Sequence, residues 1–220
     1  MLKSIGRLIG LSVLAATLGV SAPALAVTTL EFSGAVTGDY DPLNAFPVLT
    51  GTAFTGTFAF DETASDLDAG ADGFYKSIGA GYGATLSGGP YSVDLTGDVT
   101  QITLSDGPSG TADRLRLIAS NTVEFGGLDY LIQLTILLLD TSGAALVGDG
   151  LVTPTLALFP SFPLIQIDVT DVTNRKTGTY FASLDTLAAV PVPAALPLLG
   201  AGLAALGFMG WRKKRAAVAA

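Results

Sequence analysis

The side chains of this chain that could carry chemistry are carboxylates. The sequence has 19 Asp and Glu residues, 16 of them Asp, and it has no His and no Cys. These two absences exclude Ser-His-Asp triads, Cys-His dyads, His-ligated zinc and haem held by His. The chemistry that remains is acid–base catalysis by a carboxylate pair, or binding of an oxygen-ligated metal such as calcium.

An Asp- and Gly-rich loop at residues 66–73, DLDAGADG, is the candidate calcium site. Calcium prefers carboxylate oxygens that alternate along a loop, so Asp66, Asp68 and Asp72 are the expected ligands. The loop departs from the EF-hand pattern, because the fifth position is Gly70 and no Glu stands at the twelfth. The alternative is a solvated turn between two strands, which Asp and Gly also favour.

Two other sites are considered from residue type and position in predicted strands. Carboxylates inside such strands are candidates for the acid–base pair of a glycosidase, and they are Asp94, Glu124, Asp129 and Asp168. The alternative is that they point to solvent from the exposed face of a sheet. Tyrosines on strands are candidates for a sugar-stacking platform, although they also pack at the rim of a core: Tyr40, Tyr75, Tyr82 and Tyr91. We expect no catalysis by this chain.

The N-terminus, residues 1–26, has the three parts of a secretory signal peptide. A short positive region precedes an apolar stretch at residues 8–20, and Ala24 and Ala26 are the small residues of an A-x-A cleavage site. We expect the mature chain to begin at Val27. The alternative is an N-terminal helix that is not cleaved.

The C-terminus, residues 190–220, combines a proline motif, an apolar span and a basic cluster. The span, residues 194–211, would form a helix of roughly 27 Å at about 1.5 Å per residue, close to the ~30 Å hydrocarbon core of a bilayer. Basic residues favour the cytoplasmic side. We therefore expect a transmembrane helix, rather than a buried core helix, with everything before it outside the cytoplasm. The motif is Val190, Pro191, Val192, Pro193 and Ala194, and the basic cluster at 212–215 is Arg212, Lys213, Lys214 and Arg215.

These three parts, in this order, resemble the PEP-CTERM class of protein-sorting signals, and the motif resembles the VPLPA-CTERM variant. Val192 stands where that variant has Leu, which leaves the Pro-x-Pro frame intact. The resemblance covers residues 190–215. It implies export in a Gram-negative bacterium, anchoring in the inner membrane with the domain in the periplasm, and processing by an exosortase, a membrane-embedded transpeptidase. It also implies a final place at the cell surface or in the extracellular polysaccharide matrix.

The segment between the two ends, residues 27–189, holds all 19 acidic residues and only five basic ones, a formal charge of −14. Such a surface repels nucleic acid and anionic membranes, so we expect no nucleic-acid partner. Its length suits a single domain with a sizeable core. Without Cys there are no disulfides, so packing alone must hold this domain together.

Apolar residues in this segment recur with a period of two, in short runs separated by Gly, Asp, Asn and Pro, which is typical of β-strands. The clearest run, residues 128–138, also has Leu131 and Leu137 on its second face, so we expect a central strand that is covered on both faces. Residues 155–159 are another predicted strand. The whole pattern predicts an all-β domain, a jelly-roll-like antiparallel β-sandwich, flanked by the signal peptide and the C-terminal sorting helix.

The function that we expect is that of a structural or adhesive protein of the cell surface or extracellular matrix. The expected partners are the exosortase and extracellular polysaccharide, and no cofactor is expected. Two alternatives stay open. One is a calcium- or glycan-binding β-sandwich module, and the other is a carboxylate-dependent glycoside hydrolase.

Overall fold

The computed structural model describes residues 27–40, 50–68, 72–79, 81–106, 112–148 and 150–190. The chain divides into two compact units, residues 1–188 and 189–220. Within the part of the chain that is described, no helix has the length and hydropathy needed to cross a membrane. The predicted signal peptide with Ala24 and Ala26, and the predicted sorting signal from Pro191 onward, lie outside the described residues.

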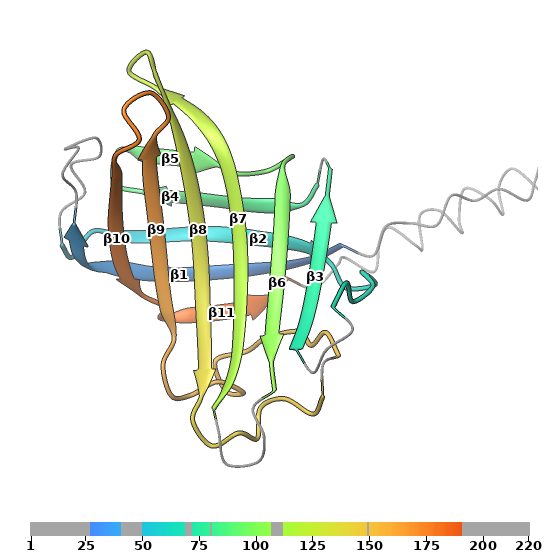
Figure 1. The fold of residues 1–220 in the computed structure, drawn as a ribbon. Coiled ribbons are helices and arrows are strands. Elements are labelled where there is room, and N and C mark those ends of the chain that lie inside the picture. The colour runs from blue at the N-terminus through green and yellow to red at the C-terminus, as the bar shows by residue number, and fades with distance from the viewer. Residues whose placement is uncertain are drawn as a thin grey trace, which may run out of the picture. The chain divides into compact units, whose positions relative to one another are not determined.

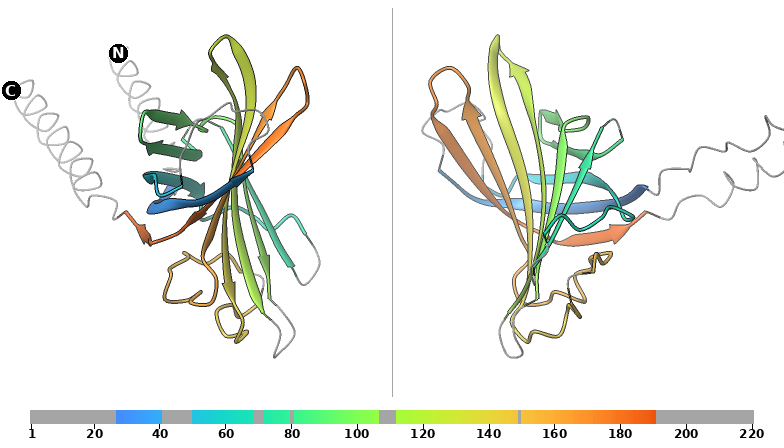
Figure 2. Two further views of the ribbon diagram at one scale, coloured as in Figure 1. Left: turned by 90° about the vertical axis from the view of Figure 1, so that its left-hand side faces the viewer. Right: turned by 45° about the vertical axis from the view of Figure 1, so that its right-hand side comes forward.

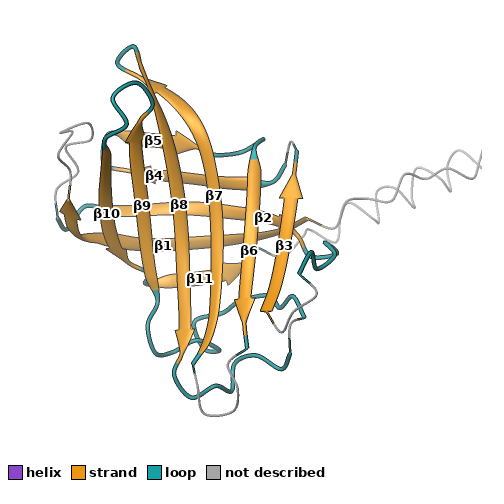
Figure 3. Ribbon diagram, in the orientation of Figure 1, coloured by secondary structure: helices purple, strands orange, loops and turns teal. Residues whose placement is uncertain are grey.

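The described residues form an all-β unit, as the sequence predicts (Figures 1 and 3). Neighbouring strands with a defined register are antiparallel. The strands are β1 (Val27–Tyr40), β2 (Ala53–Asp61), β3 (Asp72–Ile78), β4 (Gly83–Gly88), β5 (Tyr91–Asp94), β6 (Val99–Ser105), β7 (Asp113–Phe125), β8 (Leu128–Asp140), β9 (Leu164–Asp171), β10 (Thr177–Ser183) and β11 (Thr186–Ala189).

The strands belong to one continuous sheet that curls into two layers. Its order is β3-β6-β7-β8-β9-β10-β1-β2-β4-β5, and β11 pairs with β1. Strands β3 and β6 to β10 form one layer, and β1, β2, β4 and β5 run crosswise behind them as the second (Figures 1 and 2). Strand β1 joins the layers, because residues 36–40 pair with β10 while residues 27–35 pair with β2.

The continuous sheet differs from the predicted jelly-roll sandwich, which would consist of two sheets. The register of β1 against β10 shifts between Val36 and Gly38, close to the point where β1 passes from one layer to the other. An irregularity of this kind bends a strand and increases its twist. Alternation of apolar residues shows which side chains are buried, but it does not show which strands pair, so this topology was not visible in the sequence.

The core lies between the two layers. Phe58 and Phe60 from β2 are fully buried, and they share the core with Leu134 and Ile136 from β8. On β2 these positions alternate with partly or fully exposed ones, as period-two burial requires, whereas on β8 Thr135, between Leu134 and Ile136, is buried as well. The second layer therefore holds one face of each of its strands against the first layer and leaves the other face outside.

Strand β8 is central, as predicted, since it pairs with both β7 and β9. Its second face is covered only in part, which corrects the prediction: Leu131 is 42% exposed and Leu137 is half-buried, although Thr135 between them is buried. The predicted strand at residues 155–159 is a turn, in which Leu158 N donates to Thr155 O at 3.1 Å. The fully buried Phe159 explains its apolar pattern.

Candidate functional site

The outer face of the layer formed by β1, β2, β4 and β5 carries small hydroxyl side chains in register. One row across the strands is Ser33, Thr55, Ser87 and Ser92, and the next row is Glu31, Thr57, Thr85 and Asp94. Adjacent strands are about 4.8 Å apart, and alternate residues on a strand point to the same side. The two rows therefore lie side by side on one face of the layer, and we call them the hydroxyl array.

Hydroxyl groups of the array bond to one another. The Oγ1 atoms of Thr57 and Thr85 are 2.7 Å apart, and Ser33 Oγ lies 2.7 Å from Thr186 Oγ1 on β11. These four side chains line a surface hollow of about 410 Å³ together with Thr55 and others. A hydroxyl has one hydrogen to donate and two lone pairs to accept with. One hydrogen serves each pair, so the second hydroxyl of the pair keeps a hydrogen with which to bond a ligand or water.

Two carboxylates lie at the ends of the second row, Glu31 on β1 and Asp94 on β5. Asp94 Oδ1 accepts hydrogen bonds from Thr96 Oγ1 at 2.6 Å and from Thr96 N at 2.9 Å. Both bonds favour the ionised form, the side-chain bond more strongly, and lower the pKa of Asp94 below its usual value. The β5 end of the array is therefore negative at neutral pH.

The structure brings together two of the four predicted glycosidase carboxylates. Glu124 and Asp129 lie directly opposite each other near the end of the β7–β8 hairpin, and both are exposed. Asp94 is on the outer face of one layer, whereas Asp168 is on the other layer and accepts from Thr179 Oγ1 at 2.7 Å. Only Glu124 and Asp129 are thus placed as a pair, and neither lines the hollow of the hydroxyl array.

The four predicted platform tyrosines do not form a platform, which corrects that prediction. Tyr75 and Tyr82 are buried, Tyr40 is 70% exposed at the end of β1, and Tyr91 lines an apolar cavity between the layers. Burial raises the pKa of Tyr82, and the charge of Asp61 raises it further. Stacking of sugar rings on these four side chains together is therefore excluded by their positions.

In the predicted calcium loop, the side chain of Asp66 accepts hydrogen bonds from its own turn and from the beginning of β3. Its Oδ1 atom accepts from Phe74 N at 2.8 Å and from Asp68 N at 2.9 Å, and these bonds, that from Phe74 first, lower the pKa of Asp66. Asp72 is exposed at the first position of β3. Residues 69–71 lie outside the described part, and within it no three Asp, Glu, His or Cys side chains gather as a metal-binding group.

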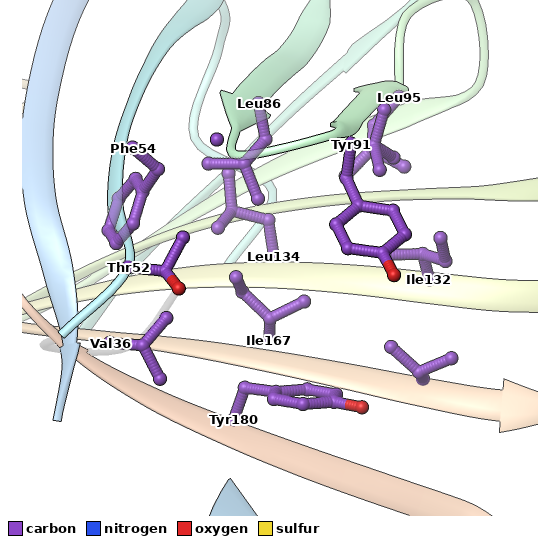
Figure 4. Close-up of a pocket in the computed structure, with 13 residues that line it drawn as sticks. Val36, Thr52, Phe54, Leu86, Tyr91, Leu95, Ile132, Leu134, Ile167 and Tyr180 are labelled. Carbon is purple, nitrogen blue, oxygen red and sulfur yellow. The ribbon is translucent and has the colours of Figure 1, made fainter. Parts of the chain in front are cut away.

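An apolar cavity of about 70 Å³ lies between the layers (Figure 4). No charged side chain is among the described residues that line it. One wall comes from β2, β4 and β5, the other from β8, β9 and β10, and Val36 of β1 closes one side. The wall residues include Phe54, Leu86, Tyr91 and Val93 on one side, and Ile132, Leu134, Ile167, Val169 and Tyr180 on the other.

Sequence reasoning missed both the hydroxyl array and the cavity. Thr55 and Thr57 were visible as the polar face of a strand, but the register that aligns them with Ser33 and Ser87 was not. The available signal was that β1, β2, β4 and β5 carry Ser and Thr at several outer positions. Comparison with protein-family models, with curated proteins and with solved structures finds no match to this chain.

Proposed function

We propose that this chain is an exported, non-enzymatic protein of the cell surface or extracellular matrix that an exosortase sorts. The observation that carries the proposal is the order of parts at residues 190–215: a Pro-x-Pro motif, an apolar span and four consecutive basic residues. The signal peptide at residues 1–26 supports the same topology independently. The acidic β-sheet unit between these ends is then the exported cargo.

The motif suits recognition by a separate enzyme. Proline fixes φ near −65°, so Pro191 and Pro193 hold a stiff extended segment that loses little entropy on binding. The apolar span would hold this segment at the outer surface of the inner membrane, where an exosortase would cut near it. A GPI signal works by the same physical logic, since its hydrophobic tail is also removed.

The test is the C-terminus of the mature protein in a host that contains an exosortase. Mass spectrometry is expected to show a chain that ends near the motif and has therefore lost the apolar span and residues 211–220. The double variant Pro191→Ala/Pro193→Ala is expected to stay full-length in the inner membrane. The matched control, Pro160→Ala/Pro163→Ala, changes two prolines in the β8–β9 connection and should be processed normally. An intact tail on the unaltered chain would refute the proposal.

The hydroxyl array favours an adhesive role, with a neutral polysaccharide as the partner. Its hollow of about 410 Å³ falls within the 300–1,000 Å³ of typical ligand sites. Its Ser and Thr side chains offer donors and acceptors that match the hydroxyl groups of sugars. The charge of −14 on residues 27–189 repels acidic polymers and favours a neutral glycan.

Retention on extracellular polysaccharide from the host tests this role. The variant Thr57→Val/Thr85→Val removes one hydroxyl pair while keeping the shape of both side chains, and several-fold weaker retention is expected. The control is Thr170→Val/Thr177→Val, which removes a similar pair, 2.8 Å apart, from exposed positions on β9 and β10. Equal retention of both variants would count against the array as the adhesive surface.

A further inference from the structure

The cavity between the layers opens to solvent on one side. Along β9, Ile165 and Val169 are buried, but Ile167 between them is only partly buried although it points to the same face. Leu86 on β4 and Val93 on β5 are likewise inward-facing and partly buried. The two layers therefore diverge here instead of interlocking, and Figure 4 shows side chains from both around an unfilled space.

The chemistry of the lining selects an apolar ligand. Oxygen atoms on its side chains belong only to Thr52, Tyr91 and Tyr180, and the described lining carries no charge. A buried water typically needs two to four polar partners, and cavities lined by aliphatic and aromatic side chains stay dry and accept apolar molecules. Hydrocarbon groups thus suit this space better than water or a polar metabolite.

The size of the cavity limits what it can hold. A water molecule needs about 10–15 Å³ of such volume, so about 70 Å³ corresponds to a short row of groups of that size. A segment of a single alkyl chain fits this space, whereas a fused ring system or a pair of lipid tails does not. Because one side is open, the remainder of a longer molecule can extend into solvent.

We propose that this cavity binds the alkyl chain of a neutral amphiphile. The neutral head group follows from charge: no Lys or Arg is among the described residues that line the cavity, and residues 27–189 carry a net charge of −14 that repels an anionic head. The chain can belong to a soluble amphiphile or to a bilayer lipid. The proposal depends neither on the sorting signal nor on the hydroxyl array.

A single introduced thiol reports occupancy, because the natural chain has no Cys. In the full chain recovered from cells, Val93→Cys places that thiol in the cavity. Octyl glucoside, kept below its micelle concentration, is expected to slow the reaction of this thiol with N-ethylmaleimide at least fivefold. The control is Val152→Cys, at another partly buried valine that packs on the core but does not line the cavity. An unchanged rate at Val93→Cys, or equal slowing at both positions, overturns the proposal.

Three further arms complete the test. Octanoate, which has a similar chain and an anionic head, is expected to protect the thiol several-fold less than octyl glucoside, and equal protection would refute the neutral preference. Adding Leu86→Trp to Val93→Cys fills the cavity and is expected to abolish protection; persistence of protection would place the ligand elsewhere. Vesicles of neutral phosphatidylcholine identify the source: protection by vesicles assigns a bilayer lipid, and protection by octyl glucoside alone assigns a soluble amphiphile.

Discussion

Replacing Gly34 by alanine should destabilise the folded unit more than an exposed glycine substitution, because β1 passes between the two layers at this point. Gly34 lies opposite Phe54 in the β1–β2 ladder. A Cβ atom there would lie 2.9 Å from Phe54 Cζ and 3.0 Å from the carbonyl carbon of Ser183, and nearer still to the Ser183 oxygen. The conflict is therefore with backbone as well as with a side chain.

Hydrogen bonds of the residues on either side of Gly34 fix the position of the backbone around Ser183. Ala35 N donates to Ser183 Oγ at 3.1 Å, and Asp185 N donates to Ser33 O at 2.8 Å. Overpacking of this kind costs about 1–3 kcal/mol, and these bonds oppose the shift that would relieve it, so we expect about 3 kcal/mol for Gly34→Ala. For a domain of this length that is a fall in Tm of about 6–12 °C.

Gly38 on the same strand is the matched control. Its added Cβ would meet no atom within 4 Å, and its φ is not in the left-handed region. Gly38→Ala is therefore expected to stabilise by about 0.4–1 kcal/mol, because alanine restricts the unfolded chain. Circular dichroism melts of residues 27–189 should show opposite shifts for the two variants. Similar shifts in Tm for the two variants would mean that Gly34 does not pack against the backbone of Ser183. The passage of β1 from one layer to the other would then be wrong.

Three further predictions concern acidic and strained turns. The pKa of Asp140 is lowered to about 2, first by the Ser142 hydroxyl and then by backbone N–H groups. Its contribution to stability is present above pH 4 and is lost as the pH falls toward 2. Between these pH values the urea midpoint of the unaltered chain should therefore fall more steeply than that of Asp140→Asn. Asp66→Ala should lower Tm more than Asp72→Ala, because Asp66 accepts hydrogen bonds from Phe74 N on β3 and from Asp68 N in the preceding turn; equal losses would contradict this. Arg175 has a φ of 55°, which strains the backbone of a residue with a side chain, so Arg175→Gly should raise the free energy of unfolding in urea by about 0.5–1 kcal/mol. A lower free energy of unfolding would show that the contacts of the Arg175 side chain outweigh the backbone strain.

The existence of most strands could be predicted from the sequence, because burial between two layers imposes a period of two. Strand β8 is the clearest case, since its even-numbered residues from 130 to 138 are all buried in the core, apart from the half-buried Gln133 and its odd-numbered neighbours on the other face. The pattern could not show that β8 has one covered face: Leu131 and Leu137 are apolar, but on β7 Arg116 lies opposite Leu137, so apolar and charged side chains share an outer face. Hydrophobicity indicates a preference for burial, whereas coverage depends on how many layers the chain builds.

The candidate sites could be predicted only where adjacent residues define them. Asp66 and Asp68 form a turn with Phe74, in keeping with the alternative of a turn between strands, because an Asp side chain can bond to backbone two residues away. The hydroxyl array and the cavity require the pairing of β1 with β2 and of β2 with β4. These pairings join residues that are about 20 or more positions apart, and no local pattern encodes them.

The hydroxyl array and the cavity are two faces of the same strands. On β2, Phe54 lines the cavity while its neighbour Thr55 belongs to the array. On β5, Val93 lines the cavity while its neighbour Ser92 belongs to the array. A slip of one residue in the β2–β4 register would turn the hydroxyls inward and the apolar side chains outward. The burial of Phe54 in the core resists that slip. The apolar interior of the layer therefore fixes which side chains face outward and how they are spaced in the hydroxyl array, so a substitution that shifts the packing inside should also change binding outside.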